Sequence, residues 1–242
     1  MHFWKPRLRA SAIHLAISLS VATLAALLVF GWWYPYPYRE LSGGRELFTL
    51  VVAVDVVLGP LITLVIFNTR KTRRHLAMDF SVIGLLQLTA LSYGLWAVFV
   101  ARPVHLVFEY TRMAVVHAVD IEPSTLTQAP PGLQQLPLRG PTLLSLRPLQ
   151  GNEAIDSVLQ AIGGISQAAQ PNLWQPYETS RMQILQASHP VARLIERFPQ
   201  NADAIASAVA RTGHPVDALR YLPLLSRTPA WPVLIDGQSP LP

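Results

Sequence analysis

The sequence predicts a membrane protein with three transmembrane α-helices followed by a small α+β domain. Hydrophobic residues make up 51% of the 242 residues and charged residues only 14%, whereas a soluble domain carries about 25% charged residues. The missing charge is confined to three long apolar runs in the first hundred residues. The remaining residues alternate between strand-like and helical patterns, which favours a mixed α+β domain there.

The three apolar runs are long enough to cross a bilayer. They cover residues 10–33, 47–67 and 80–101. Each matches the roughly 20 residues that a transmembrane helix needs. Three buried helices of a soluble protein are the alternative, but a surface-exposed helix has a polar face and these runs have none. We therefore expect three membrane spans.

The first run also resembles a signal peptide, because Lys5, Arg7 and Arg9 precede it. Its apolar core is longer than a typical signal-peptide core. No clear small-x-small cleavage site precedes the aromatic cluster that follows the run. We therefore expect residues 10–33 to be retained as a helix.

The distribution of Lys and Arg predicts the orientation in the membrane. Short loops rich in these residues stay in the cytoplasm. The tail of residues 1–9 carries three of them, and the loop of residues 68–79 carries Arg70, Lys71, Arg73 and Arg74. Residues 102–242 contain ten basic and ten acidic residues, so the net charge of +5 belongs to the membrane half. We expect the inner membrane of a Gram-negative bacterium, with residues 1–9 cytoplasmic and residues 102–242 periplasmic.

The same distribution argues against nucleic acid as a partner, although the pI is near 9.9. The basic residues flank the predicted helices and do not form a patch on the second domain. The sequence has no cysteine, which excludes disulfides, thiol catalysis and thiolate metal sites. Phosphate-binding loops, dinucleotide fingerprints and nucleophile elbows are also missing. We predict no catalytic residue, no cofactor and no metal.

Asp55 is an acid within the second apolar run. A mid-helix Asp costs about 2.5–3.5 kcal/mol on insertion scales, whereas each Leu, Ile, Val or Phe returns about 0.3–0.6 kcal/mol. The run contains fifteen such residues, so the helix still inserts. Asp55 then needs a polar neighbour or a proton.

Asp55 shares one helix face with Gly59 and Thr63, because residues four apart are neighbours on a helix. Gly59 permits close approach of another helix. Pro60 has no backbone N–H, so it frees the carbonyl of Val56 beside the acid. We expect a helix face that is polar, notched and kinked.

Two interpretations of this face stay open. Tyr93 lies at a matching depth in the third run, so an Asp55–Tyr93 hydrogen bond would fix the bundle. Alternatively, the face is a binding surface for a foreign helix, formed by Asp55, Gly59, Pro60, Thr63 and Tyr93. A pair of catalytic aspartates is excluded, because Asp79 lies about 18 Å nearer the inner surface than Asp55.

The domain after residue 101 begins with two alternating runs, 104–110 and 113–119, which predict a β-hairpin. Residues 123–150 contain six prolines and predict an irregular connector. Helical patterns follow at 152–163, 179–188, 190–198 and 201–212, and a strand begins at Trp231 and turns at Asp236–Gly237. No clear return strand follows this turn before Pro242, so the sequence leaves open whether the natural chain continues.

His105 and His117 fall in the two strands of the predicted hairpin, where they would face each other. A metal site needs more than two histidines. Ordinary sheet residues are therefore the favoured interpretation.

Several segments resemble the TfpX/TfpZ family of type IV pilin accessory proteins. These are "WWYPYPY", "DVVLGPLITLVIF", "LAMDFSVIGLLQLTALSYGLWAVFVARPV" and "LVFEYTRMAVVHAVDI", with weaker matches further on. The resemblance implies an inner-membrane chaperone without enzymatic activity that stabilises pilin subunits or assists their assembly into the pilus. Its implied partners are the major type IV pilin, the lipid bilayer and other pilus assembly proteins.

Two other functions are compatible with the predicted architecture. One is a membrane-anchored sensor or regulator whose periplasmic domain binds a ligand. Such a protein needs a cytoplasmic output domain, and only residues 1–9 and the loop of residues 68–79 are available inside. The other is a membrane enzyme, which the missing catalytic motif disfavours.

Overall fold

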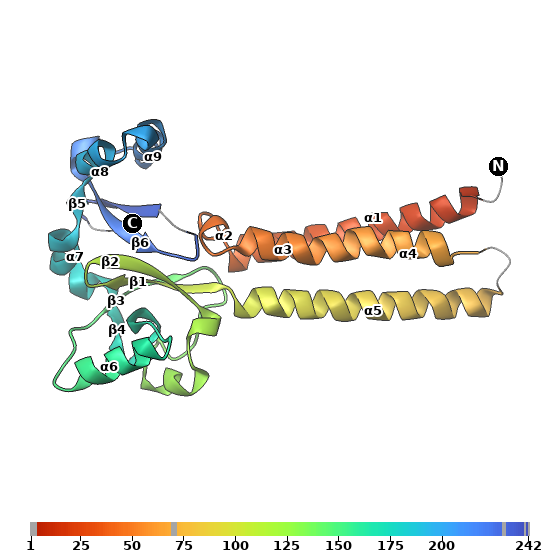
Figure 1. Ribbon diagram of the computed structural model, residues 1–242, viewed down its shortest axis with the longest axis horizontal. Coiled ribbons are helices and arrows are strands. Elements are labelled where there is room, and N and C mark those ends of the chain that lie inside the picture. The colour runs from red at the N-terminus through yellow and green to blue at the C-terminus, as the bar shows by residue number, and fades with distance from the viewer. Residues whose placement is uncertain (1–3, 69–71, 229–230, 240, 242) are drawn as a thin grey trace. The chain divides into compact units, whose positions relative to one another are not determined.

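The structure is a computed structural model that describes residues 4–68, 72–228, 231–239 and 241. Residues 1–3 of the predicted tail, Arg70 and Lys71 of the predicted loop, and Pro242 lie outside the described residues. The chain forms two compact units, Met1–Arg102 and Pro103–Pro242. The first is a helical unit and the second is a sheet unit, and each is described by itself (Figure 1).

Within the described residues, the helical unit has three helices long and apolar enough to cross a membrane: Trp4–Trp33, Gly44–Ile66 and Arg73–Val100. The first consists of α1 (Trp4–Leu28) and the π-helical turn η1 (Val29–Trp33). The second consists of α3 (Gly44–Ala53), the π-helical turn η2 (Val54–Leu58) and α4 (Gly59–Ile66). The third is α5 (Arg73–Val100), and the short α2 (Tyr38–Leu41) connects the first two.

The helices extend beyond the apolar runs at their basic ends. The first begins at Trp4 instead of Ala10, and the third at Arg73 instead of Phe80. Thr72 provides the reason at the start of α5, because its hydroxyl accepts a hydrogen bond from the backbone N–H of His75 at 3.4 Å. Such a cap stabilises a helix start whatever the hydropathy of the first turns.

One end of the helical unit is densely packed. Its core contains Ala25, Val29, Phe48 and Val98 of the three spans and Tyr34, which directly follows the first span. The Tyr34 side chain is fully buried, and its hydroxyl donates a hydrogen bond to the carbonyl of Val98 at 3.0 Å. This end of the bundle is therefore closed by apolar contacts and one buried hydroxyl.

The sheet unit contains a mixed sheet with seven strands in the described residues. They are β1 (Pro103–Glu109), β2 (Arg112–His117), β3 (Thr142–Leu146), β4 (Trp174–Pro176), β5 (His189–Pro190), β6 (Leu219–Leu225) and β7 (Trp231–Asp236). The order is β4-β3-β1-β2-β6-β5, and β7 pairs with β6. The pairs β1–β3 and β2–β6 are parallel and the others are antiparallel. The predicted hairpin is confirmed as β1 and β2.

The helices of the sheet unit lie close to their predicted positions. They are α6 (Glu153–Ile162), α7 (Arg181–Ala187), α8 (Val191–Arg197) and α9 (Ala202–Thr212). Figure 1 shows α6 at the β4 end of the sheet, and α8 and α9 at the β5 end. Gly213 ends α9 as predicted, with a φ of 73° that only glycine adopts at little cost.

The proline-rich connector is not irregular throughout, which corrects the prediction for residues 123–150. Strand β3 lies within it and pairs in parallel with β1, where Leu144 faces Val107. Pro141 and Pro148 lie outside both ends of the strand, so neither removes a hydrogen-bond donor from the ladder. The high proline content therefore concealed a short buried strand.

His105 and His117 do not face each other. The register pairs His105 with Val116, so His117 lies on the opposite face of the sheet. The His105 ring packs on Trp174, with the ring centroids 4.5 Å apart, while Nδ1 of His117 lies 3.0 Å from Oδ2 of Asp120. No group of three potential metal ligands occurs in the part of the chain that the structure describes.

Burial of His105 makes the stability of the sheet unit depend on pH. Neither ring nitrogen has a hydrogen-bond partner among the described residues, and desolvation by burial lowers the pKa of His105 to about 4. An unfolded His has a pKa of about 6.5. Between these pH values the unfolded chain binds a proton that the folded chain excludes, so stability falls as the pH is lowered.

We expect His105→Phe to remove this loss and to keep the ring on Trp174. From pH 7 to pH 5, the stability of the wild type should fall by about 2 kcal/mol more than that of the variant. Denaturant unfolding of the full chain in nanodiscs, followed by near-UV circular dichroism, measures the difference. The exposed His214 provides the control, because His214→Phe should keep the wild-type pH dependence. An unchanged pH dependence in His105→Phe would contradict this role for His105.

Candidate functional site

Asp55 lies in a π-helical turn near the middle of the second span. The turn is η2, which separates α3 from α4. Pro60 follows in the first turn of α4, and its missing N–H prevents a regular α-helical hydrogen bond to the carbonyl of Val56. The irregularity predicted from Pro60 is therefore a wider turn at Asp55.

A chain of hydrogen bonds connects the three spans next to this turn. We call it the polar seam, and it consists of the side chains of Ser11, His14, Thr63 and Gln87 and the backbone carbonyls of Asp55 and Pro60. Ser11 donates to the carbonyl of Pro60 at 2.9 Å. Nδ1 of His14 lies 2.5 Å from the hydroxyl of Thr63, and Nε2 of His14 lies 2.7 Å from Oε1 of Gln87. The Gln87 amide completes the seam by donating to the carbonyl of Asp55 at 3.2 Å.

The seam fixes the donor and acceptor roles of its members. Only the NH₂ group of Gln87 can donate to the Asp55 carbonyl, so its oxygen faces His14. Nε2 of His14 must then carry a proton and donate it to that oxygen. In the neutral imidazole, Nδ1 accepts a hydrogen bond from the Thr63 hydroxyl. Each polar side chain in the chain of bonds therefore has a partner on another span.

Gly59 makes this arrangement sterically possible. A Cβ at this position would lie 2.2 Å from Nε2 of Gln87, which is shorter than any ordinary contact. The close approach predicted for Gly59 is thus made by Gln87 of α5. Any larger residue would displace the amide from the Asp55 carbonyl.

The structure divides the predicted site residues into three groups. Gly59, Pro60 and Thr63 are buried inside the bundle, where they serve the polar seam. Asp55 keeps its carboxylate free for other contacts. Tyr93 is 69% exposed and its ring contacts Trp96, with the centroids 5.7 Å apart.

The predicted Asp55–Tyr93 hydrogen bond is therefore not formed among the described residues. Gln87 reaches the Asp55 backbone in its place. The sequence contained a signal for the two residues that were missed, because His14 and Gln87 are also polar residues within apolar runs. His14 and Gln87 could therefore have been identified as candidate site residues by the same criterion as Asp55.

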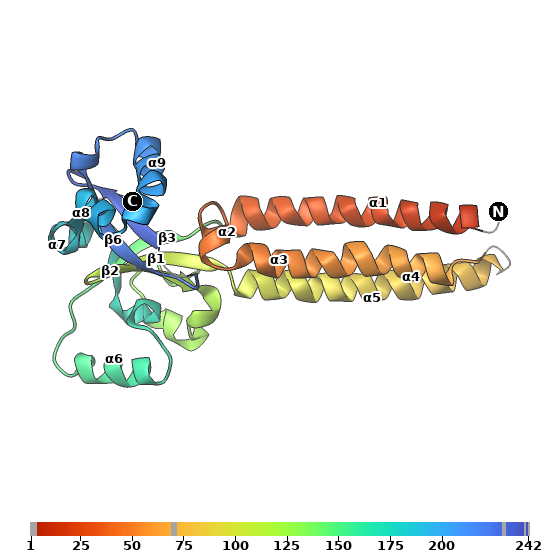
Figure 2. The same ribbon diagram turned by 45° about the horizontal axis from the view of Figure 1, so that its top comes forward.

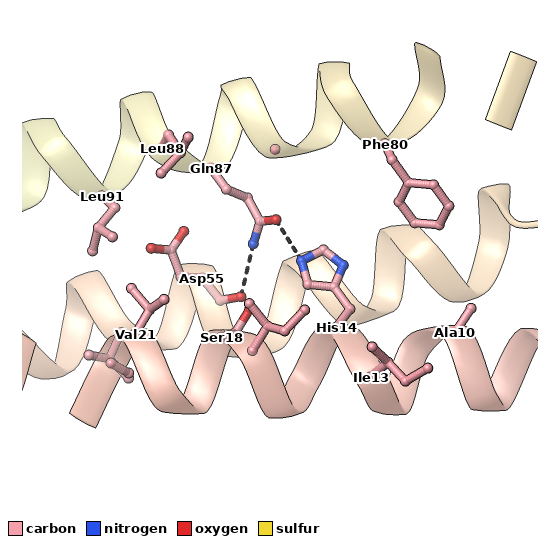
Figure 3. A pocket seen from close by; sticks show the side chains of 14 residues that line it. Ala10, Ile13, His14, Ser18, Val21, Asp55, Phe80, Gln87, Leu88 and Leu91 are labelled. Carbon is pink, nitrogen blue, oxygen red and sulfur yellow. Dashed lines mark hydrogen bonds between the residues drawn. The ribbon is translucent and has the colours of Figure 1, made fainter. Parts of the chain in front are cut away.

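An elongated groove runs between α1 and α5, with the second span as its floor. We call it the α1–α5 groove. Its volume is about 480 Å³. Its walls are mainly apolar and include Ile13, Ile17 and Val21 of α1 and Gly84, Leu88 and Leu91 of α5. Figure 3 shows the Asp55 carboxyl group pointing into this groove, beside the bonds from Gln87 to His14 and to the Asp55 carbonyl.

The Asp55 carboxylate lacks a partner on the described part of the chain. Its Oδ1 atom is enclosed and accepts no hydrogen bond there. An unsatisfied carboxylate in an apolar setting carries a large desolvation cost. The groove therefore combines apolar walls with one hydrogen-bond acceptor.

A second hollow, of about 580 Å³, lies in the sheet unit beside His117, Asp120 and Arg227. Burial raises the pKa of Asp120, but hydrogen bonds from the ring and the backbone N–H of His117 outweigh this effect and lower it. The Arg227 guanidinium lies 3.9 Å from the same carboxylate. The Asp120 carboxylate is therefore paired, although Nε2 of His117 is buried without a hydrogen-bond partner among the described residues. What distinguishes the α1–α5 groove is the unpaired carboxylate oxygen of Asp55.

We expect Gln87→Leu to destabilise the helical unit by about 1–2 kcal/mol. The substitution leaves the Asp55 carbonyl and Nε2 of His14 without partners in an apolar environment. Thermal unfolding of the full chain in nanodiscs measures the loss. Thr89→Val is the matched control on α5, because the exposed Thr89 hydroxyl donates to the carbonyl of Leu85 in its own helix and to no other described residue. Equal stability of the two variants would contradict the role of the seam.

Comparisons with known proteins point to one family. The family model described as fimbrial assembly protein FimB matches residues 2–43. The fimbrial assembly protein of Dichelobacter nodosus serogroup I is 35% identical over 231 residues, which cover 94% of this chain and 90% of the relative. The serogroup E1 protein is 33% identical with the same coverage, and the protein of serogroups C1 and C2 is 40% identical over 121 residues, covering 50% of this chain and 92% of the relative. No solved structure matches the chain significantly. The extent of these similarities shows that the chain belongs to the fimbrial assembly protein family.

Proposed function

We propose that this protein is a non-enzymatic accessory factor of type IV pilus assembly, which stabilises pilin subunits or assists their insertion into the pilus. The main support for this proposal is the similarity over 94% of the chain to a protein named for fimbrial assembly. The partners under this proposal are the major type IV pilin, the lipid bilayer and other pilus assembly proteins. The TfpX/TfpZ resemblance supports the same role.

The proposed location is the inner membrane of a Gram-negative bacterium. Lys5, Arg7 and Arg9 lie in the first turns of α1, and Arg73 and Arg74 lie in the first turn of α5. Three successive spans bring the beginnings of the first and third to the same side of the membrane. The positive-inside rule places this side in the cytoplasm and the sheet unit in the periplasm.

The architecture suits a protein that holds a membrane-anchored subunit before assembly. The helical unit offers an apolar groove at membrane depth, and the sheet unit adds a folded domain outside the spans. A pilin waiting in the membrane has a helix and a globular domain of its own. A chaperone with two units can contact both parts.

Deleting the gene for this protein should lower the amount of pilin in the membrane and the number of surface pili. Supplying the wild-type gene, or Thr89→Val as a neutral variant, should restore both. Immunoblots of membrane fractions and electron microscopy of cells measure the two effects. Unchanged pilin abundance together with normal piliation would contradict the proposed function.

Reporter fusions test the proposed orientation. Alkaline phosphatase folds into an active enzyme only outside the cytoplasm, because it needs disulfide bonds. A fusion after Gly140 should therefore be active, and a fusion after Arg73 should be inactive. The opposite pattern would place the sheet unit in the cytoplasm and contradict the assignment.

A further inference from the structure

We propose that the α1–α5 groove is a docking site for one apolar helix of another polypeptide, which carries a hydrogen-bond donor at the depth of Asp55. The proposal rests on the proposed function for the identity of this polypeptide, which is then the fimbrial subunit. Four observations support it: the shape of the groove, the open space beside Gly84, the unpaired carboxylate oxygen of Asp55 and the rigidity of the groove walls.

The shape of the groove fits a helix. On α1 the lining residues run from Ala10 to Ala22 at helical spacing, which corresponds to about 18 Å. On α5 they run from Phe80 to Leu91, or about 16 Å. Both walls therefore extend over three turns, so the groove is a trough parallel to the spans.

Gly84 offers a place for close approach. A Cβ added at Gly84 would meet no described atom within 4 Å, whereas one at Gly59 would lie 2.2 Å from Gln87 and one at Gly94 would lie 2.7 Å from Val51. Gly59 and Gly94 are thus explained by contacts within the bundle, and Gly84 is not. A glycine facing open space in the wall of a groove allows the backbone of another helix to come near.

Asp55 distinguishes a protein helix from lipid as the occupant. An acyl chain matches the apolar walls but supplies no donor for the Asp55 carboxylate, whose Oδ1 has no partner among the described residues. A helix with a serine, threonine, asparagine, lysine or terminal amine at this depth supplies one. Hydrogen bonds to charged groups are among the stronger contacts available inside an apolar medium.

The polar seam fixes the shape of the groove before a helix binds in it. Gln87 and His14 bridge α5 and α1 at 2.7 Å directly beside Asp55 (Figure 3). This bridge fixes the separation of the two walls. A site whose walls are fixed in advance loses less conformational freedom on binding. The seam uses only the backbone carbonyl of Asp55, so its carboxylate stays available.

Site-specific photo-cross-linking in intact cells tests the proposal. A benzophenone amino acid replaces Ile17 or Leu88, which line opposite walls of the groove. The control positions are Leu24 and Leu85, which are 68% and 69% exposed and do not line the groove. We expect cross-links to the fimbrial subunit from Ile17 and Leu88 and none from the two controls.

Two variants then test the features that define the site. Asp55→Leu removes the acceptor and leaves the backbone bond to Gln87 in place, so the cross-link yield should fall about tenfold. Gly84→Leu fills the groove without a clash inside the bundle and should abolish the cross-link. Gly31→Leu is its matched control, since Gly31 also faces open space but does not line the groove. The polar seam should keep all three variants folded, which unfolding in nanodiscs verifies.

The outcomes separate failure of this inference from failure of the proposed function. Cross-links to a second copy of this chain, cross-links to lipid alone, or equal yields from groove and control positions would overturn the docking site. Unchanged yields in Asp55→Leu and Gly84→Leu would overturn it too. In each case the dependence of pilin abundance on this protein still decides the proposed function independently.

Discussion

Hydrogen bonds inside an apolar bundle are the constraint on which the helical unit depends. Helices of this hydropathy gain little from packing against one another in lipid, because lipid tails are as apolar as their side chains. Polar side chains within them find partners either in their own helix, as Thr89 does, or on a neighbouring helix, since no water is available. The polar seam meets this requirement with His14 of α1, Thr63 of α4 and Gln87 of α5. The association of the three spans therefore has a specific geometry.

The irregular features of the second span follow from this geometry. Pro60 interrupts the hydrogen-bond ladder and accompanies the π-helical turn at Asp55, and Gly59 leaves room for the Gln87 amide. A regular helix with a larger residue at position 59 would keep α5 away from the Asp55 carbonyl. The same turn directs the Asp55 carboxylate into the α1–α5 groove (Figure 3). The second span nevertheless follows one continuous path through α3 and α4 beside α1 and α5 (Figure 2). Gly59 and Pro60, which would destabilise an ordinary helix, therefore make both the seam and the groove possible.

The sequence alone predicted the features that depend on composition and local pattern. Long apolar runs indicated the three spans, and a single acid within one of them indicated the polar site. The sequence could not predict which residue contacts Asp55, because depth in the membrane does not specify which face of α5 turns inward. Tyr93 is in fact exposed, and Gln87 makes the contact. In the sheet unit, β3 was missed because its short apolar run lies between prolines and is stabilised by pairing with β1. The register between β1 and β2 likewise places His105 and His117 on opposite faces of the sheet. Tertiary pairing determines these features, and local sequence does not encode it.

Membership of the fimbrial assembly protein family gives this arrangement a biological setting in fimbrial assembly. His14 and Gln87 hold the bundle together by a direct interaction, and a double-mutant cycle tests this role most directly. Unfolding of the wild type, His14→Phe, Gln87→Leu and the double variant in nanodiscs gives the coupling energy. We predict a coupling of about 1 kcal/mol. Strictly additive effects of the two substitutions would contradict the claim.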